Sequence, residues 1–83
     1  MKNKILLELY LPAAEKSFEI RVPKQIKVAQ AVGMLVEFLK KRDEGYLPTE
    51  DSVLCDLESG RVFDANAFIG CIGLQNGSRV MLV

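Results

Sequence analysis

The spacing of the apolar residues changes at Pro23, and this change limits the choice of folds more than any other feature of the sequence. Before Pro23, apolar residues occupy every second position of residues 5–11 and 17–22, and Glu8, Glu19 and Arg21 mark the opposite face, as in strands with one face against a core. The segment "PAAEK" at 12–16 interrupts the alternation with turn-forming residues. The first part of the chain therefore predicts a β-hairpin with a loop of about five residues.

After Pro23 the apolar residues recur at helical spacing over 28–41. One arc of the helical wheel holds the apolar side chains, namely Val28, Ala31, Val32, Leu35, Val36, Phe38 and Leu39. Gly33 falls on the polar side, where we interpret it as a tolerated glycine. The sequence "PKQIK" offers no Ser, Thr, Asp or Asn as an N-cap, so the first turn is expected to fray or to borrow a partner. Gly45 is the predicted stop of the helix.

The second half predicts short strands and turns. Val53, Cys55 and Leu57 alternate with Ser52, Leu54 and Asp56, which we interpret as a third strand with Cys55 facing the core. "ESGR" at 58–61 is turn-forming, and Val62 with Phe63 forms a brief fourth strand. Residues 68–74 form a compact irregular segment. Asn76 and Gly77, which tolerate positive φ, precede a last strand over 79–83 with Val80 and Leu82 on one face.

These elements predict an α+β fold formed by a single domain over residues 1–83. One amphipathic helix is expected to lie across one face of a mixed sheet of four to five strands.

The order of elements, the "GYLP" bend at 45–48 and the closing "GLQNGSRVMLV" at 73–83 resemble the ubiquitin-like β-grasp fold. The pattern "C…GL.NG.R", formed by Cys71, Gly73, Leu74, Asn76, Gly77 and Arg79, is most similar to the YukD/EsaB family of small bacterial ubiquitin-like proteins. That resemblance implies a cytoplasmic accessory or regulatory component of a type VII (ESX/WXG100) secretion system. It also implies a protein that acts through non-covalent contacts and has no catalytic residues.

Charge and cysteine content exclude several function classes. Eleven basic and eleven acidic residues give a net charge of zero, so no net field attracts nucleic acid or an anionic membrane. No apolar run is long enough to insert into a bilayer, and no signal peptide is evident. The two cysteines, Cys55 and Cys71, fit neither a zinc site nor a disulfide scaffold. A cytoplasmic protein without a metal or cofactor is expected.

The sequence gives little support to an enzyme. It contains no histidine, which removes the commonest general base near neutral pH. The acidic pairs Asp43–Glu44 and Glu50–Asp51 are interpreted as a solvated loop. Cys55 is interpreted as a core thiol, and packing is also favoured for Cys71. The glycine-rich segment 70–77 precedes a strand where a phosphate loop would need a helix, so no catalytic residue is assigned.

The outer face of the predicted sheet is the candidate protein-interaction surface. In the β-grasp order the first, last and third strands are neighbours. The apolar residues expected on this face are Leu6, Tyr10, Leu54, Met81 and Val83, interrupted by Glu8, Asp56 and Arg79. We interpret the surface as a docking site for a protein partner, for which a component of the secretion apparatus is one candidate. Closure of a homodimer and scattered exposed side chains without a role are the alternatives.

A second hypothesis is that the chain is a ubiquitin-like modifier or a sulfur-carrier type of protein, and the C-terminal residues argue against it. Those proteins need a slim tail that ends in two glycines, and this chain ends in a predicted strand at Val83. A strand bonded into a sheet cannot reach into an activating enzyme, so conjugation would require a diglycine tail that is absent from this chain.

Overall fold

The computed structural model describes residues 3–42 and 51–83. The elements in chain order are β1 (Lys4–Leu11), β2 (Lys16–Pro23), α1 (Val28–Arg42), β3 (Leu54–Asp56), the short 3₁₀ helix η1 (Ile69–Cys71) and β4 (Ser78–Leu82). The predicted hairpin, helix and last strand are confirmed, with bounds shifted by about one residue. The "GYLP" bend, the helix stop at Gly45, and Asp43, Glu44 and Glu50 lie outside the described residues.

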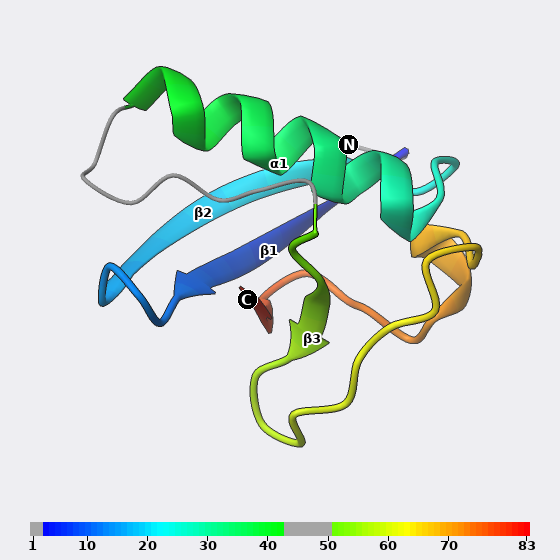
Figure 1. Cartoon of the computed structure of the whole chain (residues 1–83). Helices are drawn as coiled ribbons and strands as arrows, with labels where there is room; N and C mark the ends of the chain where they lie inside the picture. The colour runs from blue at the N-terminus through cyan, green and yellow to red at the C-terminus, as the bar shows by residue number, and fades with distance from the viewer. Residues whose placement is uncertain (1–2, 43–50) are drawn as a thin grey trace.

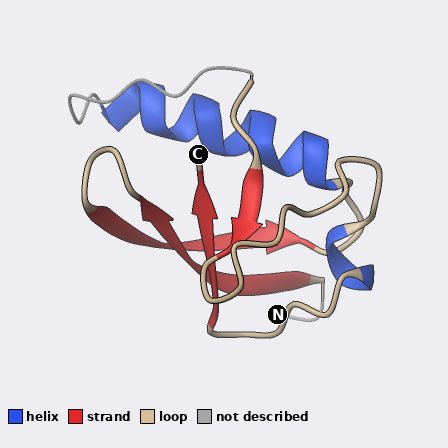
Figure 2. Cartoon of the chain, turned by 60° about the horizontal axis from the view of Figure 1, so that its bottom comes forward, coloured by secondary structure: helices blue, strands red, loops and turns tan. Residues whose placement is uncertain are grey.

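The strands form a mixed four-stranded sheet in the order β2-β1-β4-β3. β1 pairs antiparallel with β2 and parallel with β4, and β3 pairs antiparallel with β4. Two strands from opposite ends of the chain therefore lie side by side in the centre of the sheet. Figures 1 and 2 show α1 crossing one face of this sheet, and no helix covers the other face among the described residues.

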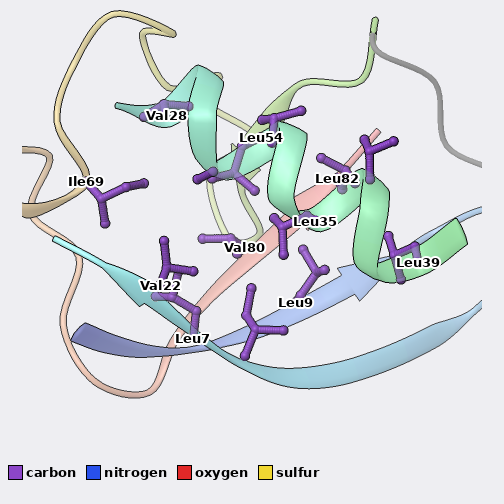
Figure 3. Close-up of a cluster of buried hydrophobic side chains, with 14 of the residues drawn as sticks. Leu7, Leu9, Val22, Val28, Leu35, Leu39, Leu54, Ile69, Val80 and Leu82 are labelled. Carbon is purple, nitrogen blue, oxygen red and sulfur yellow. The ribbon is translucent and has the colours of Figure 1, made fainter. Parts of the chain in front are cut away.

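The hydrophobic core lies between α1 and the covered face of the sheet, as Figure 3 shows. β1 and β4 supply residues that are almost completely buried: Leu7, Leu9, Leu11, Val80 and Leu82. They alternate along the strands with half-buried or exposed residues, as the period of a strand requires. α1 contributes the buried residues Val28, Ala31, Val32, Leu35, Val36 and Leu39.

Phe38 departs from the helix prediction, because it is partly exposed at the rim of the core. Its ring meets the Phe18 ring of β2 edge to face, with 6.0 Å between the centroids. The Arg42 guanidinium lies over both rings, 5.0 Å from the Phe18 centroid and 5.5 Å from the Phe38 centroid. Phe38 therefore joins the last turn of α1 to the edge of the sheet.

The first turn of α1 borrows its hydrogen-bond acceptors from a distant segment. The N–H of Val28 donates to the carbonyl of Ala67 at 2.9 Å, and that of Ala29 donates to Ala65 at 3.0 Å. The N–H of Lys27 donates to the side-chain oxygen of Gln30. These bonds replace the missing N-cap and confirm that this end of the helix needs a partner.

β3 faces opposite to its prediction. It pairs with β4 so that Leu54 lies opposite the core residue Leu82 and Cys55 lies opposite Met81. Leu54 is therefore buried in the core, with 2% of its surface exposed, and its assignment to the outer face was wrong. The consecutive apolar residues "VLC" do not show which parity faces the core, and a shift of one residue exchanges the two faces.

The structure also differs from the predictions for two other residues of the second half, Asp56 and Cys71. The N–H and hydroxyl of Ser59 both donate to Asp56 Oδ2, which closes the predicted "ESGR" turn, with Gly60 at φ 75°. Asp56, the last residue of β3, pairs with the core residue Val80, so it shares the covered face and does not interrupt the outer face as predicted. Cys71, for which packing was predicted, is exposed at the end of η1.

Candidate functional site

The uncovered face of the sheet has an apolar row that crosses three strands and a neighbouring segment. Tyr10 pairs with Met81 across the parallel β1–β4 ladder, and Met81 pairs with Cys55 across the antiparallel β4–β3 ladder. Cys55 in turn forms an isolated bridge with Val62. Because residues directly opposite each other share a face of a sheet, these four side chains lie in one row, called here the outer row.

Val62 is the member of the outer row that the sequence analysis did not assign. The N–H of Asp56 donates to the carbonyl of Arg61, and the N–H of Phe63 donates to that of Leu54. These two bonds attach the segment 61–63 to the free side of β3 and place Val62 beside Cys55. Val62 is 55% exposed, so it contributes more open apolar surface than the half-buried Tyr10 and Met81.

Cys55 lies beneath this surface and is buried, as predicted, although it belongs to the outer face. Its neighbours in the row, Met81 and Val62, flank it on the two sides of β3. Burial raises the pKa of the Cys55 thiol, because desolvation disfavours the thiolate. Cys55 therefore acts as a small apolar side chain in the row, and nothing around it activates it as a nucleophile.

Val83 extends the apolar surface beyond the outer row. The N–H and carbonyl of Val83 both bond to Val53, at 3.0 and 2.8 Å, so the β3–β4 ladder continues past the end of β4. Val83 is about half exposed and follows Met81 by two residues, which places it on the same face. The structure thus brings together three of the predicted residues, Tyr10, Met81 and Val83.

Leu6 is separated from the outer row by a pair of charged residues. Glu8 pairs with Arg79 across the β1–β4 ladder, and Arg79 Nε lies 3.8 Å from Glu8 Oε2. Both side chains are about half exposed, so solvent screens this ion pair and it contributes little to stability. Leu6 lies beyond it and also lines a groove beside β2.

Two features were sought among the described residues, a cluster of metal-ligating side chains and a membrane-spanning helix. No group of three or more Cys, Asp or Glu residues within 3–42 and 51–83 is arranged to hold a metal ion. In the same ranges, no helix has both the length and the apolar character needed to cross a bilayer.

Comparison with solved structures identifies the fold. The N-terminal ubiquitin-like domain of the 4931431F19Rik protein superposes with a TM-score of 0.76 at 17% identity, over 98% of this chain and 74% of that one. The chain has the ubiquitin-like β-grasp fold. The predicted fold class is thereby confirmed, with four strands in the sheet.

Two further structures that superpose on this chain are a separate ubiquitin-like domain and one chain of a membrane complex. The EccD5 ubiquitin-like domain from Mycobacterium xenopi matches with a TM-score of 0.78 at 14% identity, covering 96% of this chain and 92% of that domain. A chain of the MycP5-free ESX-5 inner membrane complex matches with a TM-score of 0.80 at 14% identity. This match covers 98% of the present chain and only 21% of the complex subunit.

No protein-family profile and no curated protein sequence matches the chain. Identities of 14–17% support the ubiquitin-like fold alone, and membership of the YukD/EsaB family stays a prediction.

Proposed function

We propose that this ubiquitin-like domain is a non-covalent protein-interaction module that docks a partner on the outer row and Val83. The observation that carries this proposal is the Tyr10–Met81–Cys55–Val62 row on the sheet face opposite α1. It forms a continuous strip of apolar side chains with charged residues, Glu8 and Arg79, along one side. An apolar centre with a polar rim is the usual composition of a protein interface.

The partner belongs to a type VII secretion apparatus, and the domain serves there as an accessory or regulatory component. Two observations support this assignment: the sequence resemblance to the YukD/EsaB family and the structural likeness to the EccD5 ubiquitin-like domain. The ESX designation is shared by the ESX-5 inner membrane complex, one chain of which superposes on this chain with a TM-score of 0.80. The proposed location is accordingly the cytoplasmic side of the membrane.

Binding, and not catalysis, is the proposed activity. Cys55 is buried with a raised pKa, and the exposed Cys71 has no histidine anywhere in the chain to act as its base. Neither homodimer formation nor a modifier role is supported by a specific contact of the described residues.

Affinity capture from the native cell tests the proposal. The protein carries a tag at its N-terminus, and the captured proteins are identified by mass spectrometry. We expect membrane components of a type VII apparatus to be captured by the wild type and to be reduced at least about tenfold by Met81→Asp, because a charge at the centre of an apolar interface must be desolvated. Tyr10→Ser, a milder change in the same row, is expected to weaken capture in the same direction.

Gly33→Asp is the control, because Gly33 lies on α1, away from the outer row, and a Cβ at this position meets no atom within 4 Å. Equal urea midpoints for the variants show that the fold is retained. Capture that survives both Met81→Asp and Tyr10→Ser would rule out the outer row as the docking site. Capture of proteins unrelated to secretion would overturn the assignment to the apparatus.

A further inference from the structure

One end of the molecule is formed by three segments that are far apart in the sequence. The N–H of Gly70 donates to the carbonyl of Lys24 at 2.9 Å, and the N–H of Lys24 donates to the carbonyl of Asn3 at 2.8 Å. Figure 1 shows η1 beside the turn that leads into α1, at the first turn of the helix. The surface that these segments form is called here the η1 end, and it comprises residues 3–4, 24–27 and 68–71.

The η1 end carries positive charge and no acidic residue. Lys4, Lys24 and Lys27 are exposed on it. Asp and Glu are absent from residues 3–7, 20–36 and 65–78, which include the whole of this surface. None of the three lysines forms an ion pair with another described residue. Since the net charge of the chain is zero, the acidic residues are concentrated in other parts of the molecule.

Asp64 is the acidic residue that precedes η1 in the sequence, and it bonds within its own turn. Its Oδ1 accepts a hydrogen bond of 2.9 Å from the N–H of Asn66. Its carbonyl accepts one of 3.1 Å from the N–H of Ala67. The carboxylate of Asp64 is therefore held in this turn and leaves the lysines of the η1 end without an internal counter-charge.

An exposed aromatic ring lies among these lysines. Lys27 and Phe68 form an isolated antiparallel bridge, so they lie directly opposite each other and their side chains share a face. The backbone at Phe68 is extended, with φ −80° and ψ 142°, so successive side chains point to opposite sides. The next residue, Ile69, is completely buried in the core. Its burial turns the Phe68 ring outward, where 45% of its surface is exposed.

Gly70 brings Lys24 close to the same segment. A Cβ at Gly70 would lie 3.1 Å from the Lys24 Cβ, so the first carbon of the Lys24 side chain lies against the backbone of η1. Lys24 is exposed, and its ammonium group therefore remains in water. Two paired segments, 24–27 and 68–70, thus carry two ammonium groups and one aromatic ring on a small surface.

We propose that the η1 end binds a short acidic segment of a partner protein. The Phe68 ring packs against an apolar side chain of that segment, and Lys24 and Lys27 bind carboxylates that flank it. Lys4, at the start of β1, extends the positive surface. Charge complementarity determines the choice of occupant, because a second copy that presented the same end would bring like charges together.

A protein segment fits this surface better than a nucleic acid or a membrane does. Tight binding to DNA or RNA needs a series of phosphate contacts, and these lysines belong to a chain whose net charge is zero. Stable attachment to a bilayer needs more than one anchor, and Phe68 is the single aromatic residue of the η1 end.

The η1 end is separate from the outer row, and its proposed role does not depend on the proposed secretion partner. Lys4 and Tyr10 belong to the two surfaces and lie about 20 Å apart along β1 at the usual rise of a strand. A short segment bound at one surface therefore leaves the other uncovered.

The experiment is an NMR titration of the full-length protein with a short peptide in which a central Leu is flanked on both sides by Asp and Glu. We expect the largest shifts at the amides of residues 24–27 and 68–71. The affinity should fall as salt is added, because exposed charges are screened.

Two pairs of charge reversals of equal size form the main control. Lys24→Glu combined with Lys27→Glu should weaken binding at least about tenfold, because like charges then face the peptide. Lys40→Glu combined with Lys41→Glu makes the same change in net charge at the last turn of α1 and should leave binding nearly unchanged. Equal urea midpoints show that the variants keep the fold.

The apolar contact is tested by a double-mutant cycle. Phe68→Ser should weaken binding of the Leu peptide about fivefold or more. A peptide with Ser in place of Leu should bind the wild type more weakly by a similar factor. Because both changes remove the same contact, Phe68→Ser should not weaken binding of the Ser peptide further.

Several results would overturn the proposal. These are the absence of acidic-peptide binding at about 1 mM, equal binding of a peptide with Lys in place of its acidic residues, and equal weakening by the two pairs of charge reversals. Shifts centred on Tyr10 and Met81 would assign the peptide to the outer row. Binding of a thymidine oligonucleotide or of phosphatidylglycerol vesicles, without binding of the acidic peptide, would assign the lysines to phosphate groups instead.

Discussion

The side-chain oxygen Oδ1 of Asn76 accepts a hydrogen bond of 2.9 Å from the backbone N–H of Leu6, a residue 70 positions earlier in the chain. The N–H of the next residue, Gly77, donates to the carbonyl of the same Leu6 at 2.8 Å. The parallel β1–β4 ladder begins one residue later, at Leu7 and Ser78. Asn76 therefore extends the central ladder with a side-chain group before the strand itself starts.

This bond predicts that Asn76→Ala lowers the free energy of unfolding by about 1 kcal/mol, because the N–H of Leu6 loses its acceptor. Asn76→Asp keeps an acceptor oxygen and should lose less. Urea unfolding of the three proteins measures the difference. Equal midpoints for Asn76→Ala and the wild type would show that water replaces the bond without cost.

Leu54→Ala should lower the free energy of unfolding by about 2–5 kcal/mol, because it opens a cavity in the core. Val53→Ala, at the neighbouring exposed position, should change it by less than about 1 kcal/mol. Chemical denaturation checks both values. A larger loss for Val53 than for Leu54 would reverse the assignment of the two faces of β3.

Gly33→Ala should raise the free energy of unfolding by about 0.5–1 kcal/mol, since a Cβ at this helical position meets no atom within 4 Å. Gly77→Ala should lower it by more than about 1 kcal/mol, because Gly77 has a φ of 90°. The pair can be compared by thermal and urea unfolding. Destabilisation by Gly33→Ala would indicate a packing role for this glycine.

The raised pKa of the Cys55 thiol predicts a loss of stability at alkaline pH. The folded protein holds the thiol proton more tightly than the unfolded chain, so the contribution of Cys55 is complete below the ordinary thiol pKa of 9.0. It is lost as the pH rises from that value through the higher pKa of the folded state. The difference in unfolding free energy between wild type and Cys55→Ala should therefore shrink as the pH rises above 9.0.

The same burial predicts two classes of thiol reactivity. Cys71 is exposed and should react with an alkylating reagent at the rate of a free thiol, whereas Cys55 should react only when the sheet opens. The Cys71→Ser variant leaves Cys55 as its single thiol and isolates the slow reaction. Rapid alkylation of that variant would contradict the buried position of Cys55.

The sequence predicts the first part of the fold well because its two periodicities are unambiguous. Glu8 in β1 and Glu19 and Arg21 in β2 mark the outer face of the hairpin, and the apolar residues of α1 recur at helical spacing. Even the missing N-cap gave a correct prediction, since the first turn of α1 takes its acceptors from Ala65 and Ala67.

The second half could not be predicted at the same level because its contacts are set by long-range register. In "VLC" three apolar residues follow one another, and only the pairing of Leu54 with Leu82 decides which of them faces the core. Val62 joins the outer row through bonds of its neighbours to β3, which no local pattern specifies.

The parallel pairing of β1 with β4 also has a consequence during synthesis. Leu7 and Leu9 reach their final neighbours only when Val80 and Leu82 become available, because these four residues adjoin in the centre of the sheet. The β1–β2 hairpin and α1 can form while the rest of the chain is still inside the ribosome. The core cannot close around them until residues 78–82 have emerged, so the apolar side chains of β1 that contact β4 stay exposed until then.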